Sequence, residues 1–160
     1  MKRFQEIISL ILATGFGLGY LPLMPGTWAS AATAVVCWWL VEFPLGWFVA
    51  LASTVFFIGI IVVSPADRYF SAATKKESDN RQIVIDELLG TMVALLPFFY
   101  FQKTWLGVLA GFLLFRLFDV AKFGLAKLFD RRHNRWGVML DDVFAGVHAG
   151  LILSVILWLV

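Results

Sequence analysis

The stretch FPLGWFVALASTVFFIGIIVVSPA, residues 43–66, contains no charged side chain and is long enough to cross a bilayer as one helix. A second uncharged stretch covers residues 7–41. With 61% hydrophobic residues and a mean hydropathy of +0.85, the 160-residue chain is too apolar for a water-soluble domain of this size. We therefore predict a single all-α domain, residues 1–160, that forms an integral membrane helical bundle.

Polar segments divide the chain into five predicted spans, at residues 27–41, 45–63, 83–101, 105–118 and 138–160. Residues 4–24 are interrupted by glycines and a proline, which predicts a broken or re-entrant segment that dips into the membrane without crossing it. The polar residues 64–82 predict a water-exposed loop that can be partly helical. Residues 119–137 have the spacing of an amphipathic helix on the membrane surface.

The basic residues predict the orientation. Lys2 and Arg3, together with the basic segments 64–82 and 119–137, belong on the cytoplasmic side. Five crossings then place the C-terminus outside. A secretory signal is the alternative interpretation of the N-terminus, but glycines break its apolar stretch and more hydrophobic sequence follows at once.

Five carboxylates lie at the ends of hydrophobic segments, and the predicted topology brings all five to one membrane face: Asp86, Glu87, Asp119, Asp141 and Asp142. Acids within membrane segments are costly and usually functional. Mg²⁺ binds carboxylate oxygens, typically together with substrate phosphates. We predict metal ligands at Asp86, Glu87, Asp141 and Asp142. Because Asp141 and Asp142 point about 100° apart on a helix, one would bind the metal and the other orient it or join a second site. Favourable pairing with the helix dipole is the alternative for each acid alone.

Candidate phosphate ligands flank these acids. Arg116 and Lys122 lie three residues before and after Asp119, so all three share a helix face. The alternative is a salt bridge within the helix plus a lysine that reaches the interface. The Pro25–Thr27 motif predicts a helix start, where Thr27 as cap and Ser30 in the first turn would face a phosphate or simply cap the helix.

The remaining reactive side chains favour structural roles. The only cysteine, Cys37, lies in an apolar run and is expected to be a buried free thiol. We expect His148 to be packed or hydrogen-bonded in the core and His133 to be solvated. No cysteine-phosphatase motif is present, so a metal-assisted reaction remains, and no nucleic-acid partner is expected.

Several motifs together resemble the phosphatidylglycerophosphatase A family of bacteria. In chain order they are GFGLG (15–19) leading to PGT (25–27), IDELLG (85–90), FRLFD (115–119), FDR (129–131) and GVMLDDVFAG (137–146). The likeness covers nearly the whole chain. It implies a Mg²⁺-dependent phosphoric monoester hydrolase in the bacterial inner membrane, with its active site facing the cytoplasm, that converts the membrane phospholipid phosphatidylglycerophosphate to phosphatidylglycerol and phosphate.

On this combined basis we predict two sets of site residues. The catalytic set is Asp86, Asp119, Asp141 and Asp142. The substrate-binding set is Thr27, Ser30, Arg116, Lys122 and Arg131. Two other functions remain open. A phosphatidyltransferase would use similar acids, although the Asp-Gly-x-x-Ala-Arg pattern of CDP-alcohol enzymes is missing, and an ion-coupled transporter would hold its carboxylates nearer the membrane midplane.

Overall fold

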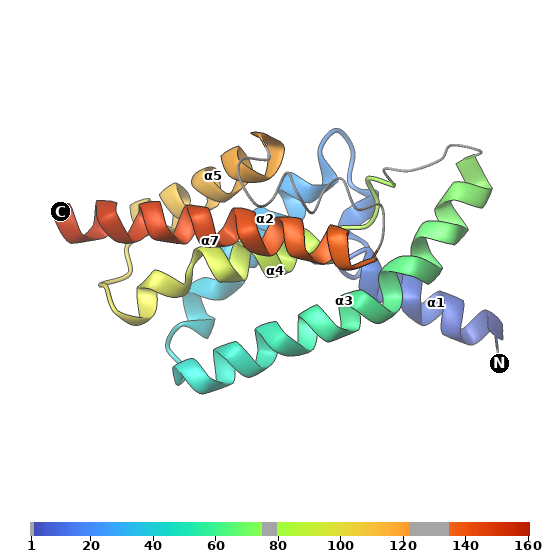
Figure 1. Cartoon of the computed structure of the whole chain (residues 1–160), viewed down its shortest axis with the longest axis horizontal. Helices are drawn as coiled ribbons and strands as arrows, with labels where there is room; N and C mark the ends of the chain where they lie inside the picture. Colours follow the sequence, from blue (N-terminus) through green and yellow to red (C-terminus); the bar gives the residue numbers. More distant parts are fainter. Residues whose placement is uncertain (1, 75–79, 122–134) are drawn as a thin grey trace.

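The structure, a computed structural model, describes residues 2–74, 80–121 and 135–160. These residues form helices and no strand, which confirms the predicted all-α class (Figure 1). The α-helices are α1 (Lys2–Ala13), α2 (Pro25–Leu40), α3 (Leu45–Thr74), α4 (Ile85–Ala94), α5 (Trp105–Ala121) and α7 (Arg135–Leu159). Two short 3₁₀ helices complete the described part, η1 (Leu18–Tyr20) and η2 (Leu96–Phe99).

Two helices among the described residues are long and apolar enough to cross a membrane, α3 over Leu45–Ala72 and α7. The five predicted spans are not supported. Helices α2 and α5 have 16 and 17 residues. At 1.5 Å per residue they reach about 24 and 26 Å, short of the roughly 30 Å of a hydrocarbon core. The odd number of membrane crossings, from which we placed the C-terminus outside, therefore loses its support.

The predicted span at residues 83–101 is broken into two elements. Helix α4 ends at Ala94, and η2 begins at Leu96 with Pro97 in its first turn. Proline has no backbone N–H and its ring collides with the carbonyl four residues earlier, so an α-helix cannot continue regularly through it. A hydropathy pattern alone does not register this break.

Helix α3 extends further than expected, because it continues through Pro65 to Thr74. The predicted loop 64–82 is thus helical in its first half, and the helix bends within its C-terminal part (Figure 1). The proposed surface helix at 119–137 falls largely outside the described residues, although α5 reaches Ala121 and α7 begins at Arg135.

The predicted break in the N-terminal segment is present. Helix α1 ends at Ala13, and the backbone then turns through left-handed conformations at Gly15 (φ 56°) and Gly17 (φ 99°) before η1. Glycine adopts these angles without steric cost. The turn returns the chain to the start of α2.

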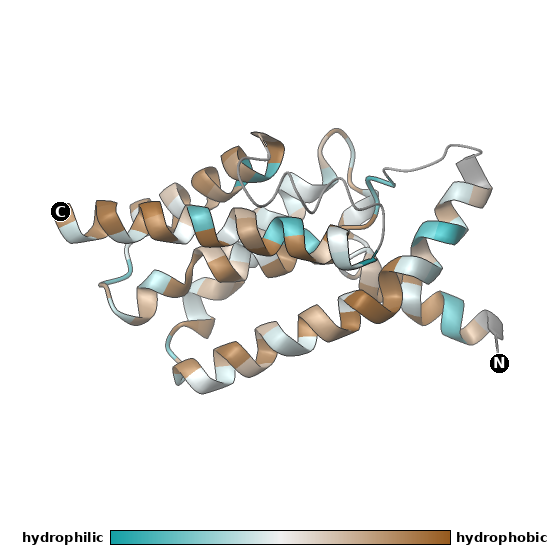
Figure 2. Cartoon of the chain, viewed as in Figure 1, coloured by the Kyte–Doolittle hydropathy of each residue, from teal (hydrophilic) through white to brown (hydrophobic). Residues whose placement is uncertain are grey.

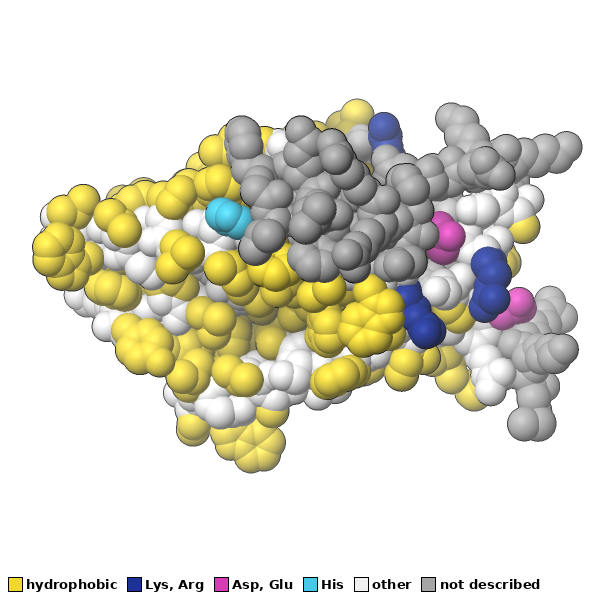
Figure 3. Space-filling view, in the orientation of Figure 1, with side chains coloured by type: hydrophobic (Ala, Val, Ile, Leu, Met, Phe, Trp, Pro, Cys, Tyr) yellow, Lys and Arg dark blue, Asp and Glu magenta, His cyan; other side chains and the backbone are white. Residues whose placement is uncertain are grey.

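Helix α4 lies at the centre of the bundle, packed against α7 on one side and α2 on another (Figure 1). Its closest approach to α7 depends on two glycines, because a Cβ on Gly146 would lie 2.4 Å from the carbonyl oxygen of Gly90. Brown and white segments make up most of the bundle, and strong teal is limited to a few short segments (Figure 2). On the face shown in Figure 3, charged side chains gather at the end that holds the start of α1 and the end of α3.

Candidate active site

The first turn of α4 presents two adjacent carboxylates. The backbone N–H of Val84, the residue before α4, donates a hydrogen bond to the carbonyl of Ala13 (2.9 Å), which ties this turn to the end of α1. The Oδ1 atom of Asp86 accepts a hydrogen bond from the backbone N–H of Glu87 (3.1 Å). The N–H groups in the first turn of a helix have no partner within that helix. The Asp86 carboxylate satisfies one of them, which agrees with the alternative interpretation that each acid pairs favourably with the helix dipole.

Helix α7 supplies a second acidic pair in the same local arrangement. The backbone N–H of Asp142 donates to Oδ1 of Asp141 (3.1 Å). Both side chains are buried, and Asp142 is 4% exposed. Charged side chains are rarely this buried without a partner.

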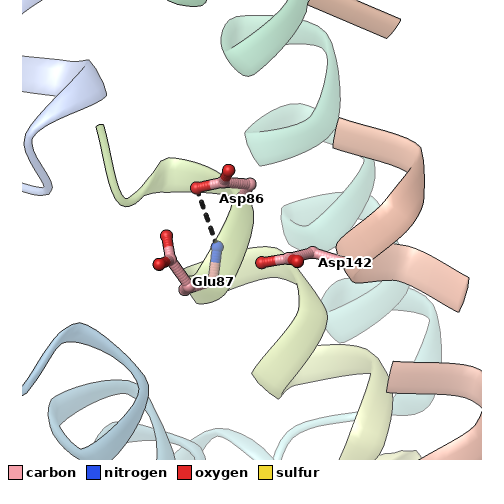
Figure 4. Close-up of side chains that lie close together, drawn as sticks. All are labelled: Asp86, Glu87 and Asp142. Carbon is pink, nitrogen blue, oxygen red and sulfur yellow. Dashed lines mark hydrogen bonds between the residues drawn. The ribbon is translucent and has the colours of Figure 1, made fainter. Parts of the chain in front are cut away.

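Three of the five acids come together between α4 and α7. Asp86, Glu87 and Asp142 each place a carboxylate oxygen within 4.8 Å of the others, and their side chains converge (Figure 4). Asp141, also predicted as a metal ligand, is not part of this group; that one acid of the pair binds the metal and its neighbour orients it stays a prediction. We call Asp86, Glu87 and Asp142 the acid cluster.

Arg116 of α5 is the cation nearest the acid cluster in the described residues. Its Nη1 atom forms an ion pair with Asp119 one turn later and lies 3.9 Å from Oε1 of Glu87. The alternative of a salt bridge within the helix is therefore realised for Arg116 and Asp119. Asp119 also lies within electrostatic reach of Glu87 and Asp142.

The start of α2 forms another wall of the site. A Cβ on Gly26 would lie 1.9 Å from Oε1 of Glu87, so any larger residue would force that carboxylate out of its position. The expectation that Thr27 caps the helix is wrong, because Met24 is the N-cap residue and Pro25 begins the helix one residue after it. The Ser30 hydroxyl donates to the carbonyl of Gly26 (2.8 Å).

Buried polar atoms without partners concentrate in this one region. Within the described ranges, four buried side-chain atoms make no hydrogen bond: Thr27 Oγ1, Glu87 Oε2, Arg116 Nε and Asp142 Oδ2. Burying a polar group without a partner costs roughly 1–3 kcal/mol by protein mutational data. Two of the four atoms belong to the acid cluster, Arg116 lies beside Glu87, and Thr27 follows Gly26, the residue against Glu87, so this region is the candidate site for a ligand.

Burial also raises the pKa values of Asp86 and Glu87. Both acids lie on α4, which is not one of the two helices long enough to cross a membrane. Removal from water raises the pKa of Glu87 to about 7, with the neighbouring charge of Asp142 adding to the effect. Desolvation and the adjacent Glu87 raise the pKa of Asp86 well above its usual range. A bound cation would reverse both effects because it favours the ionised carboxylates.

The residues present fit a hard divalent cation. Every donor in the acid cluster is a carboxylate oxygen, the type that Mg²⁺ prefers, and two of these oxygens are buried without a partner. Arg116 and Thr27 add N–H and O–H donors suited to phosphate oxygens.

The remaining predictions concern residues outside the site or outside the described ranges. Lys122, Arg131 and His133 fall outside the described residues. His148 is half-buried, donates from Nδ1 to the carbonyl of Phe144 (2.6 Å) and stacks on Phe118, and Cys37 is a buried free thiol, so both predictions are confirmed. Sequence reasoning missed Gly26 as a wall of the site. Its place in the Pro-Gly-Thr helix start was the available signal.

A helical chain with membrane-length segments and a buried group of acids beside an arginine defines a membrane-associated protein with a candidate cation and phosphoryl site. The chain belongs to the phosphatidylglycerophosphatase A family, whose model matches residues 11–157. This membership makes it an enzyme of the phosphatase class.

Three relatives show how widely the likeness extends. Phosphatidylglycerophosphatase A of Escherichia coli is 38% identical over 86% of this chain and 76% of its own length. The Haemophilus influenzae protein of the same name is 32% identical over 91% of this chain and 86% of its own length. A protein of Bacteroides thetaiotaomicron, provisionally named phosphatidylinositol-3-phosphatase, is 34% identical over all of this chain and 99% of its own. No solved structure matches the chain significantly.

Proposed function

We propose that this enzyme hydrolyses the terminal phosphomonoester of phosphatidylglycerophosphate to phosphatidylglycerol and inorganic phosphate, with Mg²⁺ as cofactor, in glycerophospholipid biosynthesis. The observation that carries this proposal is the acid cluster with its two unpartnered buried oxygens and Arg116 beside it, in a chain of this family. Two relatives bear the name of this activity.

Each component of the site has a matching task. Asp86, Glu87 and Asp142 would hold the cation, and Asp141 would orient Asp142 through its backbone contact. Arg116 and the Thr27 hydroxyl would bind the phosphoryl oxygens, with Lys122 and Arg131 as further predicted ligands. Asp119 would hold the Arg116 guanidinium in place, as it does in the observed ion pair. When bound, Mg²⁺ would neutralise charge on the phosphoryl group and lower the pKa of attacking water.

Hydrolysis breaks the bond between phosphorus and the glycerol oxygen. Water adds its oxygen to phosphorus, and the departing glycerol oxygen takes up a proton, which yields phosphate and a free hydroxyl. A carboxylate of the site accepts the proton of the attacking water. The alternative route, in which an aspartate attacks first, gives an aspartyl phosphate that water then hydrolyses. Brief reaction with ³²P-labelled substrate followed by acid quench distinguishes the two, because only the second leaves label on the protein.

We further propose that the site faces the cytoplasm of a bacterial inner membrane. The support is the charge distribution, because the charged side chains on the face shown in Figure 3 gather toward one end of the protein. In a Cys37→Ser background, a cysteine at the exposed position Arg81 should react with an impermeant reagent from the cytoplasmic side. Labelling only from the opposite side would overturn this orientation.

The Bacteroides relative supports a second candidate substrate, phosphatidylinositol 3-phosphate. Both lipids carry a phosphomonoester on an anionic head group, so the acid cluster and Arg116 suit either one. They differ in the alcohol that leaves, a flexible glycerol or a rigid inositol ring.

The deciding experiment measures phosphate release by the purified protein from each lipid, with Mg²⁺ or with EDTA. We expect rapid, Mg²⁺-dependent release from phosphatidylglycerophosphate and slower release from phosphatidylinositol 3-phosphate. The reverse order would transfer the function to the second lipid. Absence of release from both would overturn both substrate assignments.

A further inference from the structure

Two bulky residues in the connection between α1 and α2 adopt left-handed backbone angles. Phe16 has a φ of 57° and Leu23 a φ of 72°, and these are the only residues other than glycine with positive φ in the described parts of the chain. A side chain makes this conformation unfavourable because its Cβ approaches the neighbouring carbonyl oxygen, and glycine avoids the conflict. Such outliers cluster at functional sites.

Neither side chain is used in packing the protein. Phe16 is 78% exposed and Leu23 is 87% exposed, so burial within the fold does not compensate the backbone strain. Phenylalanine and leucine are also among the residues most often found in protein interiors. We therefore expect these two side chains to contact something outside the chain.

The backbone that carries them is firmly held. The N–H groups of Gly17 and Gly19 both donate to the carbonyl of Thr14 (3.2 and 2.9 Å). Nε1 of Trp28 donates to the carbonyl of Pro22 (3.3 Å), which closes the second half of the connection. Residues 16–24, hereafter the apolar loop, therefore present Phe16 and Leu23 from a fixed framework.

Both ends of the apolar loop lead directly to the active site. Just before it, the carbonyl of Ala13 accepts the hydrogen bond from Val84 that positions the start of α4. Just after it, Gly26 lies against the carboxylate of Glu87. The loop and its surroundings, residues 7–41, carry no charge, which suits contact with hydrocarbon rather than with water or a charged protein surface.

We propose that the apolar loop is a lipid-contact element beside the active site, and that Phe16 and Leu23 insert into the acyl region of the bilayer where the phospholipid substrate lies. The role in substrate use rests on the proposed lipid phosphatase function. The insertion itself does not, because it follows from the strain, the exposure and the absence of charge.

The kinetic test compares Phe16→Ser and Leu23→Ser with Leu106→Ser, a matched control. Leu106 is 79% exposed, but it lies in the first turn of α5, away from the loop. Loss of a large apolar contact with lipid should raise the KM for long-chain phosphatidylglycerophosphate in vesicles roughly tenfold in each loop variant. The kcat, and the activity on a soluble dihexanoyl substrate, should stay unchanged. An unchanged KM in both loop variants, or the same rise in Leu106→Ser, would overturn the proposal.

Replacing Phe16 with glycine distinguishes the effect of the lost side chain on KM from the effect of the strained backbone on stability. Glycine relieves the positive φ, so Phe16→Gly should melt at a higher temperature than the original protein while its KM in vesicles rises. If the phenylalanine served only the fold, the same variant would melt at a lower temperature and keep its KM.

A measurement that needs no turnover distinguishes failure of this proposal from failure of the proposed function. In a Cys37→Ser background, nitroxide labels at positions 16 and 23 should be accessible to oxygen and shielded from a nickel chelate in phosphatidylglycerol-containing vesicles. A label at the exposed position 81 should show the opposite pattern. Nickel access at positions 16 and 23, or dipolar broadening between labels of two copies, would overturn the proposal, the second result in favour of a protein interface.

Discussion

The two ends of α2 each adjoin charged side chains, and the two groups are built in opposite ways. At the C-terminal end, the ammonium of Lys103 pairs with Glu42, donates to the carbonyl of Trp38 (2.9 Å) and lies 4.6 Å from the centre of the Trp38 ring. That ring stacks on Trp105 with the ring centres 3.9 Å apart. At the N-terminal end, Thr27 and Glu87 keep buried oxygen atoms without partners.

The difference teaches which charges serve the fold and which await a ligand. A charge whose hydrogen-bonding capacity is used within the chain gains nothing more from a ligand. Buried atoms without a partner in the chain keep a desolvation cost that a bound ligand would reduce. We therefore expect the C-terminal end of α2, beside Lys103, to be structural and the N-terminal end, at Gly26 and Thr27, to be functional. Substitutions at the two ends should behave differently.

The largest effect should follow the loss of one negative charge from the acid cluster. Asp142→Asn and Asp86→Asn preserve side-chain shape but remove a proposed cation ligand. Activity should fall by at least about 100-fold, since even an outer partner of a metal ligand is worth 10- to 100-fold. Phosphate release at saturating Mg²⁺ measures this, with Glu42→Gln as the control at the structural end. Near-normal turnover in both aspartate variants would remove these acids from the mechanism.

A smaller loss is expected when the wall of the site is moved without any change of charge. In Gly26→Ala, the new methyl group would overlap Glu87 Oε1, which must then shift. Activity should fall by about 10- to 100-fold, the range expected for a misplacement of about 1 Å. Gly46→Ala is the matched control, because a Cβ there meets no atom within 4 Å. Equal activity in the two alanine variants would show that Glu87 needs no fixed position.

These residues also show how far sequence reasoning reached. The acids and Arg116 were found because charge in an apolar chain is conspicuous, and the Pro25–Thr27 start of α2 was visible in its proline. The contact between Gly26 and Glu87 joins residues 61 positions apart, so it depends on how α2 packs on α4, which no local pattern encodes. The five spans are not supported because α2 and α5 are too short to cross a bilayer and because hydropathy averages over Pro97, where the α4 segment breaks.

The acid cluster should also make stability depend on pH when divalent cations are removed. The pKa of Glu87 rises from 4.5 to about 7 on folding, and that of Asp86 also rises. Between these values the folded state binds more protons than the unfolded state, so the free energy of unfolding should fall as pH increases from 4.5 to about 7. Thermal unfolding in detergent with EDTA measures this, and added Mg²⁺ should oppose the loss. Stability that increases over this interval in EDTA would contradict the assigned burial of the two acids.

The smallest effect should come from the structural end. Lys103→Met removes an ion pair with the exposed Glu42 and a contact with the Trp38 ring. The free energy of unfolding should decrease by about 1 kcal/mol, because exposed ion pairs and cation–π contacts each contribute little. Phosphate release should stay within about twofold of the original, given this small energetic change. A loss of activity as large as that of Gly26→Ala would mean that the two ends of α2 are coupled.

Calorimetric titration of Mg²⁺ into the purified protein, with inorganic phosphate present, tests most directly the claim that the unpartnered atoms form a ligand site. The original protein and Lys103→Met should both bind Mg²⁺ saturably, and binding should disappear in Asp142→Asn. Binding should also strengthen with phosphate in the original protein and lose that dependence in Arg116→Gln. Equal Mg²⁺ binding by Asp142→Asn and the original protein, or no binding by either, would contradict the account.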